Sequence, residues 1–225
     1  YDTGNVGRDV YAVRSLVRSG NSGGPLLAPD GTVLGMVFAA ALDERTGRTA
    51  GNGSLMRTSA VALAHLDDPV ALVQAAEQVS ALTHADPRTG QACALWCLGI
   101  RHAVLTGTLP DLRACVSFLP EDSRAFWVDR VDEAEAQEPA TFGHNGYVVT
   151  TLQAAWSAIT HTPVPPDAPG DRRFECQHLV DALDAAVRIG HDTDTVASVA
   201  GALLGAKWGA SSIPARWRGI LHGWP

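Results

Sequence analysis

The segment from Gly190 to Thr195 places two aspartates and a hydroxyl directly before a run of small and apolar residues, 196–206. Asp192 and Asp194 are separated by one residue, and two carboxylates this close resist joint ionisation unless a cation or hydrogen-bond donors hold them. A helix that begins here supplies part of that stabilisation through its free N–H groups and the positive end of its dipole. A hard divalent cation such as Mg²⁺ or Mn²⁺, which favours carboxylate, hydroxyl and water oxygens, would supply the rest.

An ordinary helix N-cap explains the same residues without a metal ion. In that interpretation Asp194 or Thr193 caps the helix and Asp192 is solvated. Spacing alone favours the cap over the metal site, and both hypotheses stay open on the residues of this segment.

The pattern of the chain changes between residues 43 and 53. Upstream, from 9 to 41, short apolar runs are separated by Gly, Asn and Pro and carry β-branched residues, which predicts two or three strands. Residues 43–53 carry three glycines and no apolar periodicity, so we place a domain junction there. Downstream the apolar period becomes helical, which predicts a mainly α protein with an N-terminal strand segment.

The helical part is predicted to form one all-α bundle. Apolar periodicity and stop signals predict helices at residues 58–66, 69–83, 88–106, 109–118, 122–136, 147–160, 174–189, 195–208 and 214–221. Asp68, which precedes Pro69, is expected to cap the second of these. The six tryptophans are interpreted as core packing.

Composition excludes several classes of function. A formal net charge of −7 argues against binding to nucleic acid, for which a basic stripe is the usual footprint. No uncharged apolar run is long enough to span a bilayer, and we expect no membrane association. Cys93 and Cys97 share one face of a predicted helix, where zinc would need two further soft ligands. Buried free thiols are the favoured interpretation, which predicts a reducing, cytoplasmic location.

The segment from Ser19 to Leu26 reads SGNSGGPL and is followed by an apolar run. It resembles the nucleophile loop of a trypsin-like serine protease, in which Ser22 would attack the substrate while backbone N–H groups bind the oxyanion. The resemblance covers about residues 1–47 and implies a fragment of such a barrel. No histidine precedes Ser22, and a hydroxyl without a base is a poor nucleophile. We therefore expect no proteolysis.

A second resemblance covers residues 48–225. Four segments carry it, and they read GNGSLMR at 51–57, SALTH at 80–84, NGYVV at 145–149 and GHDTDTVASVAGALLGA at 190–206. In this order they resemble the C-terminal half of an ADP-ribosylglycohydrolase. The resemblance implies an incomplete all-α bundle of that family, preceded by the protease-like strands.

The resemblance also implies a function and a site. Such enzymes are metal-dependent hydrolases that remove ADP-ribose from modified protein side chains or related conjugates, using two Mg²⁺ or Mn²⁺ ions. Asp192 and Asp194 are implied as catalytic carboxylates and, with Thr195, as metal ligands. The substrate-binding residues implied by the resemblance are Asn52, Gly53, His84, Gly146 and Tyr147. The expected partner is an ADP-ribosylated protein or an ADP-ribose-containing small molecule, while the oligomeric state is not predicted.

Ordinary explanations exist for the implied substrate-binding residues. Gly51, Asn52 and Gly53 could form a simple turn before a helix. A cationic His84 could interact with a helix C-terminus. The Tyr147 ring could pack in the core instead of stacking on adenine.

Activity of the family also depends on an upstream half, with an acidic residue and a Thr-Asp-Asp cluster. Residues 48–225 do not resemble that half, so we expect impaired activity. One alternative is an inactive ADP-ribose-binding, truncated or fused protein. A second is a protease-derived protein that uses Ser22.

Overall fold

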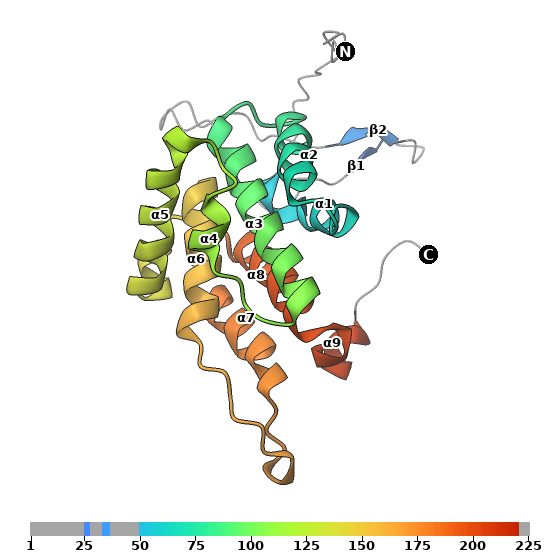
Figure 1. Cartoon of the computed structure of the whole chain (residues 1–225). Helices are drawn as coiled ribbons and strands as arrows, with labels where there is room; N and C mark the ends of the chain where they lie inside the picture. The colour runs from blue at the N-terminus through green and yellow to red at the C-terminus, as the bar shows by residue number, and fades with distance from the viewer. Residues whose placement is uncertain (1–24, 28–32, 37–49, 221–225) are drawn as a thin grey trace. The chain divides into compact units, whose positions relative to one another are not determined.

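The computed structural model describes residues 25–27, 33–36 and 50–220 (Figure 1). The chain divides into two compact units, Tyr1–Ala40 and Ala41–Pro225. This division falls just before the segment 43–53, where the sequence predicts a domain junction.

The described part of the first unit is a pair of strands. Strand β1 (Pro25–Leu27) pairs antiparallel with β2 (Val33–Met36), and the register shifts between Leu26 and Leu27. Both strands lie within the segment 9–41, for which strands are predicted. Ser22 lies outside the described residues, so its predicted place in a nucleophile loop stays a prediction.

The described part of the second unit is helical, as predicted. The α-helices are α1 (Ser59–Ala64), α2 (Pro69–Ala81), α3 (Pro87–Thr106), α4 (Leu112–Val116), α5 (Glu121–Ala136), α6 (Val148–His161), α7 (His178–Arg188), α8 (Thr193–Trp208) and α9 (Ala215–Arg218). Short 3-10 turns are η1 (Leu55–Arg57), η2 (Pro139–Phe142), η3 (Pro169–Asp171), η4 (Glu175–Gln177) and η5 (Ala210–Ser212). The predicted all-α bundle is confirmed, and none of its described helices is long and apolar enough to cross a membrane.

Aspartates fix the starts of three helices. Asp68 accepts hydrogen bonds from the N–H groups of Val70 and Ala71 at 2.8 and 3.0 Å, which confirms the predicted cap of α2. Asp86 and Asp111 cap α3 and α4 in the same way. Each cap satisfies N–H groups that the first helical turn leaves without a partner.

Helix α3 is the centre of the bundle (Figure 1). Twelve of its twenty residues are buried, because it packs against α1, α2, α4, α6 and α8. The fully buried Trp96 donates from its indole N–H to the carbonyl of Val199 in α8 at 3.0 Å. Its ring meets Trp156 of α6 edge to face, with centroids 6.5 Å apart. The interpretation of these tryptophans as core is confirmed.

The cysteines of α3 are free and buried, as predicted. Cys93 lies 3.3 Å from the Ser54 hydroxyl, and Cys97 lies 3.1 Å from that of Thr58. Burial raises the pKa of Cys93, and raises that of Cys97 to about 12. Both thiols therefore stay protonated near neutral pH and serve as packing groups.

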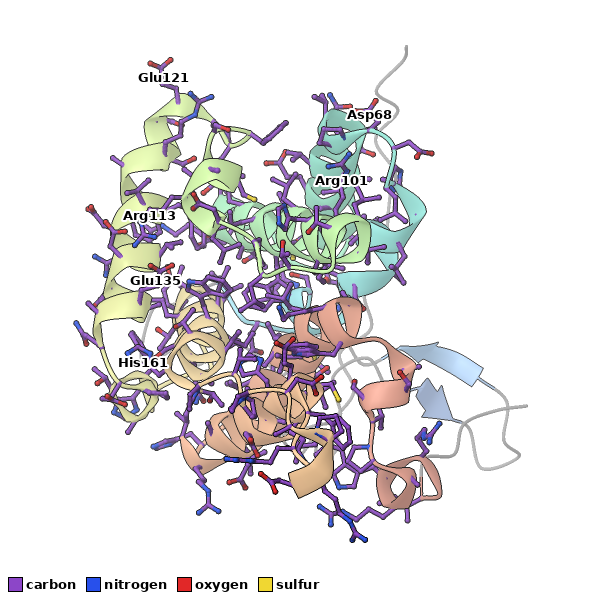
Figure 2. The ribbon with its side chains drawn as sticks, turned by 60° about the horizontal axis from the view of Figure 1, so that its bottom comes forward. Asp68, Arg101, Arg113, Glu121, Glu135 and His161 are labelled. Atoms are coloured by element: carbon purple, nitrogen blue, oxygen red, sulfur yellow. The ribbon has the colours of Figure 1, made fainter. Side chains whose placement is uncertain are left out.

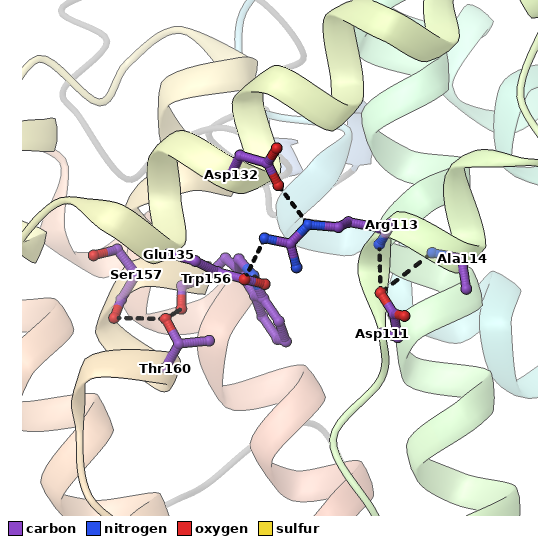
Figure 3. Close-up of polar contacts among 8 residues, drawn as sticks. All are labelled: Asp111, Arg113, Ala114, Asp132, Glu135, Trp156, Ser157 and Thr160. Carbon is purple, nitrogen blue, oxygen red and sulfur yellow. Dashed lines mark hydrogen bonds and ion pairs between the residues drawn. The ribbon is translucent and has the colours of Figure 1, made fainter.

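An exposed ion-pair network joins α4, α5 and α6 (Figure 3). The guanidinium of Arg113 contacts Asp132 and lies 2.6 Å from the Glu135 carboxylate. Glu135 also accepts a hydrogen bond from the indole of Trp156 at 2.9 Å. Figure 2 places Arg113 and Glu135 beside one another on this outer edge. Exposed pairs contribute only about 0–1 kcal/mol each, so the network orients α5 more than it stabilises the fold.

The fully buried His178 begins α7, four residues later than predicted, because the 3-10 turn η4 precedes it. Its Nε2 lies 3.0 Å from the carbonyl of Ile159, and its Nδ1 accepts from the Trp208 indole at 3.2 Å. A carbonyl can only accept, so Nε2 carries the proton and the ring is neutral. Burial lowers the pKa of His178, and Lys207 adds to that effect while Asp181 opposes it.

We expect His178→Gln to lower the free energy of unfolding at neutral pH by about 1–3 kcal/mol, because a buried donor or acceptor loses its partner. The folded-state pKa of His178 lies below its ordinary value of 6.5, so the unfolded chain binds more protons. Stability from this group is complete above 6.5 and declines as the pH falls toward the folded-state pKa. The variant should show a shallower decline in urea unfolding followed by tryptophan fluorescence.

His102→Gln is the matched control, since the His102 ring only bonds the exposed Thr108 hydroxyl. Equal pH dependence of unfolding in wild type and His178→Gln would contradict the assignment.

Candidate functional site

Three segments that are distant in the sequence meet at the side chain of Asn52. Its amide nitrogen lies 2.7 Å from the Oδ2 of Asp192. The same nitrogen lies 3.1 Å from the carbonyl of Asn145 and 3.1 Å from the Thr151 hydroxyl. Two amide hydrogens thus serve three acceptors, and the shortest bond is the charge-assisted one to Asp192.

The fully buried Asn145 connects the same segments from the other side. Its Oδ1 accepts from the backbone N–H of Asp192 at 2.9 Å, and its amide donates to the carbonyl of Gly190 at 3.2 Å. Its own carbonyl accepts from the hydroxyl of Thr151 at 2.6 Å. Asn145 belongs to the motif NGYVV at 145–149, but neither Asn145 nor Thr151 is predicted from the sequence as a site residue.

A backbone bridge holds the Asn52 turn against the start of α6. Gly51 and Tyr147 form an antiparallel bridge, and the N–H of Val148 donates to the carbonyl of Ala50 at 3.0 Å. A Cβ on Gly51 would lie 3.5 Å from the Nε2 of His84, so the His84 ring lies within van der Waals range of this turn. The simple-turn explanation of residues 51–53 therefore misses that the turn is fixed by long-range contacts.

The first turn of α8 carries the predicted acidic pair. Asp192 occupies the N-cap position without capping a backbone N–H. Its Oδ1 instead accepts from the hydroxyl of Thr195 at 2.9 Å, while its Oδ2 accepts from Asn52. The N-cap alternative names Asp194 or Thr193 as the cap with Asp192 solvated, whereas the N-cap position belongs to Asp192, which is half-buried and accepts hydrogen bonds on both carboxylate oxygens. Asp194 is exposed in the first turn, and Thr195 is buried.

These residues fit a hard cation in the kind of donor that they offer. Each carboxylate oxygen of Asp192 accepts one protein hydrogen bond and retains a second lone pair. The Thr195 hydroxyl uses its hydrogen on Asp192, so its oxygen lone pairs are available. Within the described residues no group of three or more His, Cys, Asp or Glu side chains could hold a metal ion, so the carboxylates that these residues bring to the start of α8 are Asp192 and the exposed Asp194.

His84 lies between α2 and α3, close to the Asn52 turn. Its Nδ1 lies 2.8 Å from the hydroxyl of Thr83, which also accepts from Arg57. Burial lowers the pKa of His84, and the nearby charge of Arg57 lowers it further. The ring is therefore neutral near pH 7, which argues against a cationic His84 at the helix C-terminus.

The remaining predicted substrate-binding residues lie around the same turn. Gly53 is buried, and its carbonyl accepts from the Arg57 guanidinium at 3.0 Å. Gly146 is exposed, and Tyr147 is half-buried with its hydroxyl accepting from Arg88 at 3.0 Å. The guanidinium of Arg88 also lies over the ring of Phe126 in α5, 4.8 Å from its centroid. Arg88 lies in none of the motifs quoted above, so the sequence does not predict its contact with Tyr147.

A family model for ADP-ribosylglycohydrolase matches residues 4–224. The chain belongs to the ADP-ribosylglycohydrolase family. The match also runs through most of residues 1–47, so a boundary between a protease fragment and this family at residue 47 stays a prediction.

Relatives within the ADP-ribosylglycohydrolase family are distant. The ADP-ribosylarginine hydrolase Tri1 of Serratia proteamaculans (strain 568) is 25% identical over 170 residues, covering 75% of this chain and 42% of that protein. Tri1 of Pseudomonas putida (strain GB-1) is 26% identical over 169 residues, covering 75% and 41%. A solved ADP-ribosylglycohydrolase-related protein complex matches with a TM-score of 0.54 and 28% identity, covering 77% of this chain and 56% of that one. The chain spans less than half the length of these curated relatives.

The resemblance to a serine protease is also found, over a short stretch. A serine protease of Mycobacterium tuberculosis (strain CDC 1551 / Oshkosh) is 56% identical over 39 residues, which cover 17% of this chain and 10% of that protein. This match is similar in length to the predicted fragment and far shorter than a protease domain.

The contact between Asn52 and Asp192 can be measured by a double-mutant cycle of Asn52→Ala and Asp192→Ala. We expect a coupling free energy of about 1.5–3 kcal/mol in urea unfolding, as for a partly buried hydrogen bond to a charged group. Bonds of Asn52 to Asn145 and Thr151 cancel in the cycle. A coupling below about 0.5 kcal/mol would show that the two side chains do not depend on one another.

Proposed function

We propose that this chain acts as a metal-dependent hydrolase that removes ADP-ribose from modified arginine side chains. Family membership supports the reaction class. One arrangement supports the site, namely the Asp192 carboxylate held by Asn52 and Thr195, with Asp194 two residues later in the first turn of α8. The names of the two curated relatives, both ADP-ribosylarginine hydrolases, support arginine as the acceptor.

Asp192, Asp194 and Thr195 are the residues that would hold Mg²⁺ or Mn²⁺. When bound, such a cation orients sugar hydroxyls and polarises water. Three protein oxygens supply about half of the ligands that these ions take, so water or further ligands complete the shell. We therefore expect weak cation binding and low turnover by these 225 residues.

The other residues would bind and orient the substrate. Neutral His84 can donate or accept a hydrogen bond without repelling or attracting charge. Tyr147, held by Arg88, offers an aromatic face for the adenine, and Gly146 leaves that approach open. Hydrolysis requires a base that takes a proton from water, and the exposed Asp194 carboxylate can fill this role.

The proposed partner is an ADP-ribosylated protein, with ADP-ribose-containing small molecules as the alternative. A net charge of −7 disfavours nucleic acid as a partner. Free buried cysteines support a reducing, cytoplasmic location.

Calorimetric titration with ADP-ribose, with and without Mn²⁺, tests the proposed site. We expect Mn²⁺ to strengthen ADP-ribose binding in the wild type, and expect Asp194→Asn to remove that gain because a carboxylate ligand is lost. Asp67→Asn is the matched control, since Asp67 is exposed at the opposite end of α2 from His84. Equal ADP-ribose binding by wild type and Asp194→Asn at all Mn²⁺ concentrations would overturn the metal assignment.

Release of ADP-ribose from an ADP-ribosylated arginine peptide, followed by mass spectrometry, tests turnover. Mn²⁺-dependent release that Asp192→Asn abolishes supports the hydrolase. Binding without any release would identify the inactive binding module instead. Labelling of Ser22 by a serine-directed phosphonate would favour the protease-derived alternative, and we expect none.

A further inference from the structure

A pocket of about 280 Å³ lies between the end of α2 and the start of α3. Its polar lining comes from Glu77, Ser80, His84, Asp86 and Gln91. Alanines and prolines form much of the remaining wall. The pocket therefore combines two carboxylates with apolar sides, a lining that suits a charged group on an aliphatic stem.

Glu77 is the carboxylate whose charge the protein does not compensate. Burial alone raises its pKa, and no ion pair of Glu77 occurs in the part of the chain that the structure describes. The backbone of Glu77 lies close to α3 at Gly90, where a Cβ would lie 3.4 Å from the Cα of Glu77. A partly desolvated carboxylate of this kind gains from a cationic ligand.

Within the described residues, the cations around the pocket do not pair with Glu77. Arg57 donates to Gly53 and to Thr83, and Arg88 donates to Tyr147 while lying over Phe126. His84 is neutral and adds no positive charge. Asp86 caps α3 and interacts with the charge of Arg88, so Glu77 is the carboxylate of this pocket that a cationic ligand would meet.

The spacing of the acidic groups disfavours a metal ion as the occupant. Glu77, His84 and Asp86 do not form a metal-holding group, since none is found among residues 50–220 and the two strands. An organic cation is larger than a metal ion and can contact carboxylates that lie further apart. A guanidinium also presents donors in several directions at once.

The pocket adjoins the candidate site through His84. The same ring that lines the pocket approaches Gly51, and the neighbouring Asn52 bonds Asp192. A group in this pocket therefore lies next to the substrate-binding turn, on the α2–α3 side of it.

We propose that the pocket lined by Glu77, His84 and Asp86 binds a cationic side chain, a guanidinium or an ammonium, of the acceptor polypeptide. The inference rests on the proposed function, because that function makes an arginine-bearing polypeptide the substrate. Two sources share this chemistry, namely the modified arginine itself and a basic residue next to it in the acceptor.

NMR titration of ¹⁵N-labelled protein with N-acetyl-arginine amide, and with the citrulline analogue that matches its shape without the charge, tests the pocket. We expect the resonances of Gly90 and of the Gln91 side chain to shift with arginine, and citrulline to bind about tenfold or more weakly, as for loss of a charged hydrogen bond. Glu77→Gln should remove this discrimination. Glu138→Gln, the same change at an exposed position without a capping role, should keep it.

Equal binding of arginine and citrulline amides by the wild type would overturn the proposal, and so would unchanged discrimination in Glu77→Gln. The first result requires no variant, so it stands even if Glu77→Gln fails to fold. No ADP-ribose is present in this titration. Failure here with intact Mn²⁺-dependent ADP-ribose binding therefore rejects the pocket alone, and the reverse result rejects the nucleotide site alone.

ADP-ribosylated peptides distinguish the two sources of the cation. One peptide carries lysine beside the modified arginine, and the other carries glutamine there. Tighter binding of the lysine peptide that Glu77→Gln abolishes assigns the pocket to the neighbouring residue. Equal binding of both peptides, weakened alike by Glu77→Gln, assigns it to the modified arginine. Equal binding that Glu77→Gln leaves unchanged contradicts both.

Discussion

The hydrogen bond between the amide of Asn52 and the carboxylate of Asp192 joins residues that are 140 positions apart in the chain. A partly buried carboxylate is costly unless donors face it, and here the donors are the side chains of Asn52 and Thr195. Asn145 then holds the Asp192 backbone, and the bridge from Gly51 to Tyr147 fixes the third segment. The geometry of the candidate site is thus determined by one polar network. The helices that carry its residues hold this network in place.

That support comes from the burial of the helices that carry the network. Helices α6 and α8 both pack against α3, and Trp96 ties α3 to α8 through a buried hydrogen bond. Because α6 and α8 begin at the site, their packing fixes where Tyr147 and Asp192 lie. Sites carried by rigid helices are held more precisely than sites on loops, so the packing of α6 and α8 fixes the positions of the site residues at their N-terminal ends.

Local features of the sequence predict most of the fold and little of the network. Apolar period and caps such as Asp68 before Pro69 predict the helices because those signals lie within a few residues. The start of α7 is missed because Phe174 and Gln177 bound the 3-10 turn η4, in which the Gln177 side chain accepts from the Phe174 N–H. Asn145 and the role of Asp192 as an acceptor are missed because their partners lie far away in sequence. Motif resemblance locates the segments, while only the folded chain shows which atoms meet.

The choice of an amide at position 52 has an electrostatic consequence. A lysine or arginine there would also stabilise the Asp192 carboxylate, but it would neutralise its charge. Asn52 donates a hydrogen bond and brings no net charge, so Asp192 keeps both its orientation and its attraction for a cation. Arg57 and Arg88, the cations of the surrounding turns, are directed at Gly53 and Tyr147 instead. Within the described residues, the protein therefore fixes the Asp192 carboxylate without pairing it with a basic side chain that would compete with an incoming cation.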